Sequence, residues 1–445
     1  MSSLTGAVRG LIAGPARRLK LKEKYLAWKI LRALLAGSSG KDGRLPILII
    51  NHHFDQDIAA LRHALNGRPD AAVIQTIAPN DLYALARCYL PDSASDFYGY
   101  VDPALAAGKA ALRALLVGVL RTLKKRRPRL VFVSPSDQFF WIREFVAACK
   151  AVGLPFIVLD KEGTISPLFY ETQAELIKRY MPPICDYVLV WSERQKEYYR
   201  RSGFPDPAGI TVVGQPRSDF WNQPERWAER GKLFRELDLD PEKKTILYFD
   251  FESDNYIKKE MFDRGYNWDA LLADIHAELC ELARRAPQIN IIFKVHPQAR
   301  NLEQVRAQIA AANAANVRLV TGAALSNDLI VQADLTVGFH STAMLEAMLT
   351  AKPLIYTYWG KAPESKQDLI PFDENRGIEV AISRDDFRRR LETHVNNGFK
   401  SVLTPELKRE RRKLTEVFFF QPDGHVSERV LARIAGLAAE YHRER

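Results

Sequence analysis

The sequence predicts an α/β protein with two doubly wound parallel-sheet domains. Short apolar runs alternate with helical patterns along most of the chain, as in βαβ units. Several of these runs are unbroken, such as 45–51, which is typical of strands buried on both faces of a parallel sheet. A stretch with Gly and Pro, 211–220, separates two such series. At 445 residues the chain is also too long for one ordinary core.

The first series forms an N-terminal domain, residues 44–220, which we expect to bind the acceptor. Its predicted strands are 45–51, 71–77, 129–134, 155–159, 186–191 and 210–213. Its predicted helices are 57–65, 103–124, 137–152 and 193–202. The polar cluster 51–57 follows the first strand, where it could meet an acceptor or simply cap the next helix.

The second series forms a C-terminal domain, residues 221–420, which we expect to bind the nucleotide. Its predicted strands are 245–250, 289–295, 317–320, 335–337 and one that starts at 354. Its predicted helices are 271–285, 302–313 and one that begins near 341. Residues 421–445 are predicted to form a helix that returns toward the N-terminal domain.

Residues 1–43 differ from the rest, with a basic amphipathic segment followed by a Gly/Ser linker. Basic side chains alternate there with leucines and with Tyr25 and Trp28, a composition typical of helices that lie on anionic bilayers. We therefore predict that residues 9–35 contact the anionic inner-membrane surface. The alternative is an ordinary helix that packs on the first domain and exposes its basic face.

The bulk composition is that of a soluble protein, with 47% hydrophobic and 27% charged residues. The formal net charge of +10 favours a polyanionic partner, but no motif for nucleic-acid binding is present, so no nucleic acid is expected. No continuous apolar run reaches the roughly 18 residues of a membrane span. Four cysteines stand singly, without metal spacing, which indicates free thiols in the cytoplasm. No metal site is predicted.

Residues 334–355 are predicted to form a strand–turn–helix–strand unit, with Gly338 at the turn. Ser341 and Thr342 occupy the N-cap region of the helix, whose N-terminus would lie at the carboxyl edge of the sheet and favour an anion. Glu346, about one turn later, could reach a ribose hydroxyl or be an ordinary helix carboxylate. On its own, the unit could equally be a well-capped core helix.

Lys294 lies in the strand 289–295 and His296 directly follows that strand, two positions later, so we expect the two side chains to share one face at its carboxyl end. Ligands of open α/β sheets bind at that edge. A lysine and a histidine there can hold a phosphate, and the imidazole can protonate a leaving oxygen. The alternative is a surface lysine beside a strand-end histidine.

Asp160 and Glu162 follow another buried strand, and Gly163 permits a tight turn that could direct either carboxylate toward a substrate. A carboxylate there could take the proton of an acceptor hydroxyl, with Glu162 favoured. The alternative is a polar turn. Asp250, Glu252 and Asp254 are weaker candidates for contact with a nucleobase or ribose.

Two Rossmann-like domains facing a cleft, with a terminal helix crossing back, resemble the GT-B glycosyltransferase architecture. Glu162-Gly163, His296-Pro297 and Ser341-Thr342 resemble motifs of bacterial sialyl- and Kdo-type transferases. That resemblance implies a base at Glu162 or Asp160, and CMP-phosphate contacts from the other two motifs. Lys161 departs from it, since those transferases have an acid there. CDP-glycerol glycerophosphotransferases share the Lys-x-His-Pro and Ser/Thr elements.

Segments 191–196, 213–219 and 423–429 also resemble bacterial capsule and surface-carbohydrate proteins, so the resemblance covers about 130–440. It implies a glycosyltransferase of capsule or lipopolysaccharide biosynthesis, cytoplasmic and peripheral to the inner membrane. The donor would be a nucleotide sugar, CMP-linked rather than UDP-linked, and the acceptor a lipid-linked or other glycan; no permanently bound cofactor is implied. The alternatives are a nucleotide-sugar epimerase, a CDP-glycerol-type glycerophosphotransferase and a non-enzymatic membrane-surface scaffold.

Overall fold

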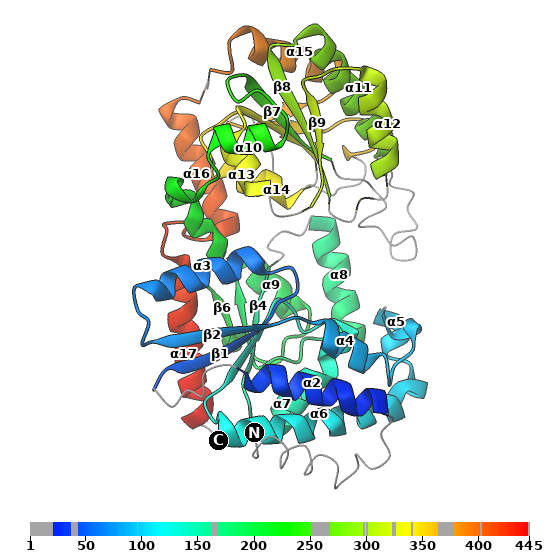
Figure 1. The fold of residues 1–445 in the computed structure, drawn as a ribbon, viewed down its shortest axis with the longest axis vertical. Helices are drawn as coiled ribbons and strands as arrows, with labels where there is room; N and C mark the ends of the chain where they lie inside the picture. The colour runs from blue at the N-terminus through cyan, green and yellow to red at the C-terminus, as the bar shows by residue number, and fades with distance from the viewer. Residues whose placement is uncertain are drawn as a thin grey trace. The chain divides into compact units, whose positions relative to one another are not determined.

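The chain folds into two compact units, each built on its own six-stranded parallel sheet (Figure 1). The computed structural model describes residues 21–36, 43–95, 97–161, 167–250, 268–296, 299, 301–322, 326–339, 341–363, 377–400 and 403–443. One unit consists of Met1–Gly163, Glu171–Asp219 and Phe419–Arg445, and the second of Thr164–Tyr170 and Phe220–Phe418. The predicted fold class, two doubly wound parallel-sheet domains, is confirmed.

The sheet of the first unit has the strand order β2-β1-β3-β4-β5-β6, and every neighbouring pair is parallel. Its strands are β1 (Leu45–Ile50), β2 (Ala72–Ile77), β3 (Val131–Ser134), β4 (Phe156–Leu159), β5 (Tyr187–Val190) and β6 (Ile210–Val212). Residues of β1, β3 and β4 are fully buried, as their unbroken apolar sequence predicts.

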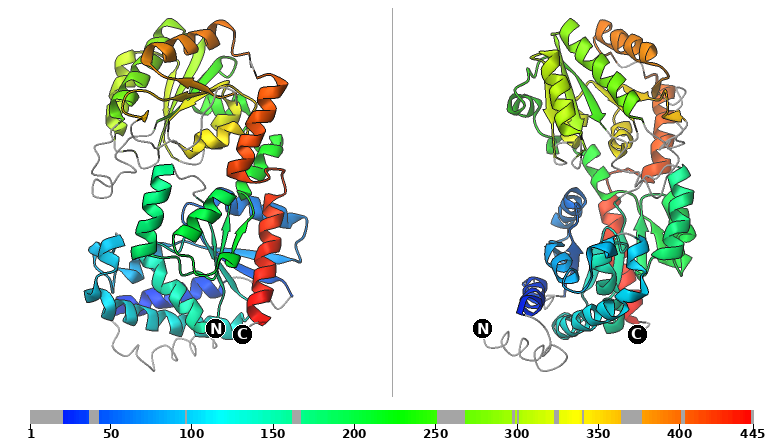
Figure 2. Two further views of the ribbon diagram at one scale, coloured as in Figure 1. Left: turned by 180° about the vertical axis from the view of Figure 1, so that it is seen from behind. Right: turned by 90° about the vertical axis from the view of Figure 1, so that its right-hand side faces the viewer.

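Helices connect these strands and cover both faces of the sheet (Figures 1 and 2). They are α2 (Leu21–Leu35), α3 (Asp55–Asn66), α4 (Asn80–Ala86), α5 (Phe97–Tyr100), α6 (Ala106–Arg126), α7 (Phe140–Val152), α8 (Pro167–Tyr180), α9 (Glu193–Arg201) and α17 (Val426–Arg443). Short 3-10 turns are η2 (Asp92–Ser95), η3 (Pro103–Leu105), η4 (Pro207–Gly209) and η5 (Pro216–Asn222).

The C-terminal helix α17 completes the core of the first unit. Its apolar face, with Val426, Val430 and Ile434 fully buried, packs with strand residues that include Ile47 and Val133. Hydrophobic positions three and four residues apart place these side chains on one stripe of the helix. The end of the chain is therefore part of the same core as its first strand.

Helix α2 packs against α4 and α6 of the first unit. Leu26, Ile30 and Leu34 are buried, whereas Leu21 and Tyr25 are 89% and 58% exposed. For residues 21–35 the structure thus has the packed helix that the sequence left as an alternative to a purely interfacial segment. Packing of one stripe leaves the opposite, basic face of α2 accessible.

Helix α6, with η3 before it, was not predicted as a candidate membrane span, but in the described part of the chain Pro103–Arg126 is long and apolar enough to qualify. Lys109 and Arg113 interrupt the run of apolar residues, which is why no continuous run is visible in the sequence. Only 22% of its most apolar window is buried, and Leu112 and Leu116 are among the buried residues that pack α6 within the unit.

The sheet of the second unit has the order β12-β11-β10-β7-β8-β9, again with parallel pairs throughout. Its strands are β7 (Lys244–Asp250), β8 (Ile289–Val295), β9 (Val317–Val320), β10 (Leu335–Gly338), β11 (Leu354–Thr357) and β12 (Glu379–Ala381). Its helices are η6 (Pro224–Arg226), α10 (Arg230–Glu236), α11 (Asp269–Arg285), α12 (Leu302–Ala312), α13 (Ser326–Gln332), α14 (Thr342–Met348), α15 (Arg384–Asn396) and α16 (Pro405–Phe419).

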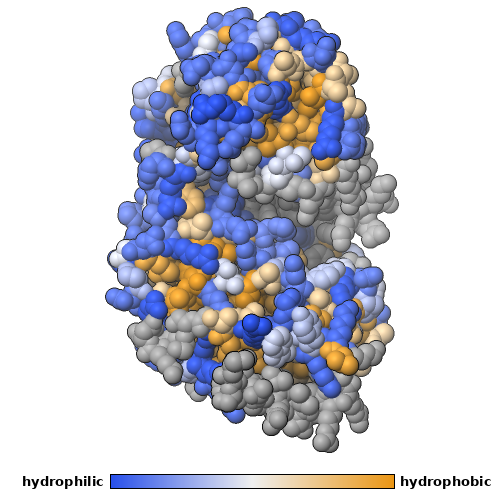
Figure 3. All heavy atoms as spheres, viewed as in Figure 1, coloured by the Kyte–Doolittle hydropathy of each residue, from blue (hydrophilic) through white to orange (hydrophobic). Residues whose placement is uncertain are grey.

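The strand order of the second unit reverses between β7 and β10. The chain runs from β7 outward through β8 to β9, and then continues on the other side of β7 with β10, β11 and β12. Connections leave in opposite directions at such a switch point, so the carboxyl ends of β7 and β10 border a natural ligand crevice. Figure 3 shows hydrophilic side chains over most of one face of each unit, with hydrophobic patches between them.

Candidate functional site

Lys294 is a buried cation near the carboxyl end of β8. The strand is apolar and buried along its whole length, and the Lys294 residue itself is only 3% exposed. In the part of the chain that the structure describes, its Nζ donates one hydrogen bond, to the Val295 carbonyl at 3.1 Å. Desolvation lowers the Lys294 pKa to about 8, because burial disfavours the charged form.

Lys294 lies in one row with residues of the two strands at the switch point. It pairs with Phe249 of β7, and Phe249 pairs with Gly338 of β10. Paired residues of parallel strands point to the same face, and two strand spacings amount to about 10 Å. The structure therefore brings the lysine and the β10–α14 turn to the same edge and the same face, as the sequence predicts.

Gly338 is the last residue of β10, and the reason for its presence differs from the expected one. It does not have the left-handed backbone conformation that a tight glycine turn would use. A Cβ at this position would lie 2.8 Å from Sδ of Met344, on α14. The missing side chain thus makes room for α14 to pack closely against the face of the sheet that carries Lys294.

Ser341 is the N-cap of α14, as predicted: its side chain accepts a hydrogen bond from the Ala343 N–H at 3.3 Å. Thr342, the first helical residue, is half-buried, and Glu346 is 6% exposed. The helix has only seven residues, so its dipole contributes less to anion binding than the sequence pattern predicts. His340, between Gly338 and the N-cap residue, lies outside the described residues.

His296 follows β8 directly and is half-buried. Its carbonyl accepts a hydrogen bond from the Ala299 N–H at 2.9 Å, so the chain turns immediately after the strand. Because side chains alternate along a strand, a position two beyond Lys294 continues the same face. The convergence of the Lys294 and His296 side chains on one ligand stays a prediction, and Pro297 lies outside the described residues.

Asp250, a weaker sequence candidate, belongs to a buried network on the opposite face of the sheet. Its carboxylate accepts hydrogen bonds from Tyr248 at 3.0 Å and Asn301 at 3.1 Å, and lies 3.0 Å from His276 Nε2. Burial alone would raise the Asp250 pKa, but the bonds from His276, Asn301 and Tyr248 hold it below the usual value. Glu252 and Asp254 lie outside the described residues.

Sequence reasoning did not identify His276 and Asn301 as part of the edge. His276 lies within α11, and its Nδ1 contacts Gln308 Oε1 of α12 at 2.7 Å. Asn301 precedes α12 at the end of the segment that starts with His296. Its place directly before a helix was the one signal in the sequence, since Asn is a common N-cap residue.

Asp160 follows β4 and is buried, with 8% exposure. Its backbone N–H donates to the Leu189 carbonyl at 2.9 Å, and Tyr199 hydrogen-bonds to its side chain. Burial and the nearby carboxylate raise the Tyr199 pKa well above its usual value. Glu162, the favoured base, lies outside the described residues, so both assignments stay predictions.

His52 lies just after β1, at the carboxyl end of the strand next to the edge strand β2 of the first sheet. Its ring contacts Phe139 and Trp141 with centroids 4.7 and 5.7 Å apart. Burial, and then the positive charge of Lys161, lower the His52 pKa to about 4, so the imidazole is neutral at pH 7. The 51–57 cluster, to which His52 belongs, therefore lies near Lys161, the residue before Glu162.

The backbone around His52 is held in an unusual shape. His53 has φ of 54°, a left-handed conformation that non-glycine residues rarely adopt and that recurs at functional sites. The Asn51 side chain accepts a hydrogen bond from the Phe54 N–H at 3.0 Å and donates to Asp55 at 2.6 Å. Asn51 thus bonds to Phe54, the N-cap residue of α3, and to Asp55, its first residue, while contact of this cluster with an acceptor stays a prediction.

Comparison with known proteins identifies the family. Residues 157–436 match the family model of CDP-glycerol:poly(glycerophosphate) glycerophosphotransferases, which covers more than half of the chain. The chain belongs to this family. The match spans Asp160, Lys294, His296 and the Ser341-Thr342 pair, and it ends within α17.

A curated relative is the lipid-A-disaccharide synthase of Azoarcus sp. (strain BH72), 26% identical over 267 residues. The matched part is 59% of this chain, and the chain spans only 59% of that relative. Among solved structures, a putative UDP-N-acetylglucosamine 2-epimerase from Listeria monocytogenes has a TM-score of 0.55 at 12% identity, covering 89% of this chain and 97% of that one.

The UDP-GlcNAc 2-epimerase from Neisseria meningitidis, bound to UDP-GlcNAc, has a TM-score of 0.51 at 11% identity and covers 88% of this chain and 100% of its own. At such low identity these structures show the fold, which is GT-B-like. Within the part of the chain that the structure describes, no three His, Cys, Asp or Glu side chains cluster as metal ligands.

Proposed function

We propose that the protein is a transferase of bacterial surface-polymer biosynthesis that uses a cytidine-activated donor. The observation that carries the proposal is Lys294, a buried lysine at the carboxyl edge of β8, beside the switch point of its sheet. A desolvated ammonium is stabilised by an anion at close range. A nucleotide phosphate at this edge would supply that anion.

Family membership supports a donor of the CDP-glycerol type, and the resemblance to sialyl- and Kdo-type motifs supports a CMP-sugar. Both donors lose CMP when an acceptor hydroxyl attacks. In CDP-glycerol the hydroxyl attacks the β-phosphorus, and in a CMP-sugar it attacks the anomeric carbon. The bond to the CMP oxygen breaks, and the acceptor proton passes to a base, proposed as Glu162 or Asp160. Lys294 would neutralise the departing phosphate and His296 would hold or protonate it.

Ser341 and Thr342 are proposed to complete the phosphate contacts, and Glu346 to contact the ribose. The acceptor is proposed to be a lipid-linked or other glycan at the cytoplasmic face of the inner membrane. Helix α2 supports this location: its Arg32 guanidinium lies 5.4 Å from the Trp28 ring, and Tyr25 and Lys29 are exposed beside them. Cations next to aromatic rings are typical of segments at an anionic interface.

The test is a binding panel followed by a transfer assay. CMP and CDP should raise the melting temperature more than UMP and UDP, because a ligand that binds only the folded state stabilises it. CDP-glycerol and CMP-sugars are then offered with a lipid-linked glycan acceptor. A folded protein that binds no cytidine nucleotide would refute the proposal, and turnover of a nucleotide sugar without any acceptor would indicate an epimerase instead.

A further inference from the structure

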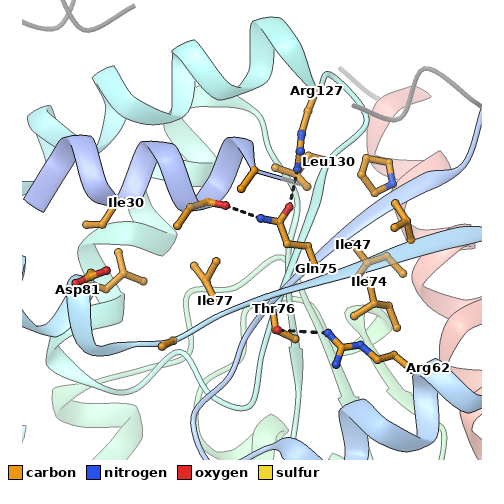
Figure 4. A pocket seen from close by; sticks show the side chains of 16 residues that line it. Ile30, Ile47, Arg62, Ile74, Gln75, Thr76, Ile77, Asp81, Arg127 and Leu130 are labelled. Atoms are coloured by element: carbon orange, nitrogen blue, oxygen red, sulfur yellow. Dashed lines mark hydrogen bonds between the residues drawn. The ribbon is translucent and has the colours of Figure 1, made fainter. Parts of the chain in front are cut away.

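A cavity of 570 Å³ opens in the first unit beside β2, the edge strand of its sheet (Figure 4). This volume lies within the about 300–1,000 Å³ of typical small-ligand sites. Most of its lining is aliphatic and comes from α2, β1, β2 and the residue before β3: Ile30, Ile47, Val73, Ile74, Ile77 and Leu130. Figure 3 shows hydrophobic atoms at the surface over β1 and β2.

Hydrogen bonds fix the walls of this cavity relative to one another. The Gln75 side chain of β2 donates to the Ala33 carbonyl of α2 at 2.5 Å and accepts from Arg127 at 2.8 Å. Arg127 also donates to the Leu35 carbonyl at 3.3 Å, so one arginine joins the edge strand to the end of α2. The helix is thereby fixed next to the strand by hydrogen bonds, and the aliphatic side chains between them remain accessible.

The charges around the cavity favour an anion. Arg62 of α3 is exposed, and among the described residues its guanidinium donates to a hydroxyl, that of Thr76, at 3.3 Å (Figure 4). Arg127 is buried, which lowers its pKa because burial disfavours the charged form. The lining acid, Asp81, is already paired with Lys29 at 2.7 Å. The lining therefore carries two guanidinium groups and one carboxylate, and that carboxylate is already paired with a lysine.

We propose that this cavity binds the apolar chain of an anionic amphiphile, with the acidic group of that amphiphile at Arg62. Aliphatic walls bury the chain, and an accessible guanidinium can bind a phosphate through two parallel hydrogen bonds. Helix α2 contributes Ile30 and Ala33 to the cavity and exposes Lys29 and Arg32 outside it. If the proposed function holds, on which this one step rests, the ligand is the lipid phosphate of the acceptor.

The probe is decyl phosphate, titrated calorimetrically below its micelle concentration into the full chain without nucleotide. Decyl maltoside has the same chain without the charge, and inorganic phosphate has the charge without the chain. We expect saturable binding of decyl phosphate, weaker binding of decyl maltoside and no binding of inorganic phosphate. Equal affinity for decyl phosphate and decyl maltoside would contradict the role of Arg62, and inorganic phosphate that binds as tightly as decyl phosphate would contradict the role of the aliphatic walls.

Two variants test the two halves of the ligand. Arg62→Ala should weaken decyl phosphate about tenfold or more, the loss expected for a charge-assisted bond. Arg68→Ala removes an exposed charge that does not line the cavity, just after the same helix, and should change nothing. Ala33→Phe should fill the cavity and abolish binding of the chain.

Wild-type affinity in both Arg62→Ala and Ala33→Phe would overturn the proposal, as would a wild-type protein that does not bind decyl phosphate. CMP binding is measured on the same samples and should be unchanged, because none of these residues belongs to the second unit. A wild-type protein that binds CMP but not decyl phosphate would refute this proposal alone, and one that binds decyl phosphate but no cytidine nucleotide would refute the proposed function alone.

Discussion

The Asp219 carboxylate accepts a hydrogen bond from the Ser427 N–H at 2.7 Å, although 208 residues separate the two in the chain. Its other oxygen accepts from the Val426 N–H at 2.8 Å, so Asp219 caps the first turn of α17 from a distant part of the sequence. Burial raises the Asp219 pKa, while the bonds from Ser427 and Val426 oppose that shift.

The surroundings of Asp219 show the structural role of three segments, 191–196, 213–219 and 423–429. These are the segments that resemble bacterial capsule and surface-carbohydrate proteins. Gly214 has φ of 94°, and a Cβ there would lie 3.0 Å from Val426 Cγ1. Trp191 stacks on Phe419 with centroids 6.1 Å apart. All three segments therefore converge where the chain re-enters the first unit, and in this unit they anchor the C-terminal helix.

Replacing Asp219 with alanine should destabilise the first unit. Two buried N–H groups would lose their acceptor, which costs about 1–3 kcal/mol of unfolding free energy. Urea denaturation followed by tryptophan fluorescence measures this loss. Asp206→Ala is the matched control, because the exposed Asp206 accepts one N–H, that of Ala208. A loss no larger in Asp219→Ala than in Asp206→Ala would show that α17 does not depend on this cap.

Most of the fold could be predicted because most of its strands are apolar and buried. Strands such as β7 and β8 were placed almost to the residue, since unbroken aliphatic runs have few other interpretations. The short strand β12, Glu379–Ala381, was missed because three residues with one acid carry little periodicity. The switch point could not be read from the sequence either, because strand order depends on tertiary pairing.

The candidate site was predicted in part for a similar reason. Lys294 and His296 share a face because strands alternate, and Ser341 precedes a helical pattern as caps do. The burial that lowers the Lys294 pKa and the orientation of Asp250 toward His276 arise from packing between elements, which no local pattern encodes.

Nucleotide binding should weaken as the pH rises above about 8. The Lys294 pKa is lowered to about 8 in the free protein, so its ammonium loses its charge from there upward, and an anion binds the charged form. CMP affinity measured from pH 6.5 to 9.5 should fall through this range, and Lys294→Met should lower the affinity and remove the pH dependence.

Lys352→Met is the control for this experiment. Burial also lowers the Lys352 pKa to about 8, but its Nζ donates to the carbonyls of Val331 and Ala333, away from the edge. This variant should keep the pH dependence of CMP binding. For both lysines the folded pKa lies below the unfolded 10.5, so the unfolded state binds more protons between pH 8 and 10.5 and their contribution to stability rises with pH there.

Glu162→Gln should abolish transfer with little change in nucleotide affinity, because a base acts on the acceptor proton and contacts no phosphate. Asp160→Asn should instead lower stability, since Asp160 is buried and hydrogen-bonded to Tyr199. The measurements are kcat, CMP affinity and melting temperature for each variant. Full activity in Glu162→Gln together with inactive but folded Asp160→Asn would transfer the role of base to Asp160.

His276→Phe should weaken nucleotide binding without touching the ligand. His276 contacts Asp250, and Asp250 accepts from Asn301 at the end of the segment that starts with His296. Removing the imidazole leaves a buried carboxylate short of a donor, which costs about 1–3 kcal/mol and loosens that segment. Calorimetry with CMP and urea denaturation, run on the same variant, measure the two effects.

His394→Phe is the control that separates a role of His276 in positioning the nucleotide site from a role in stability alone. His394 is also buried and lies 2.7 Å from a carboxylate, that of Glu379 on β12, four strands from β8 in the sheet order. Both variants should lose stability, but only His276→Phe should lose CMP affinity, because only its network reaches the segment after β8. If the two variants bind CMP equally well, the Asp250 network supports the fold and does not position His296.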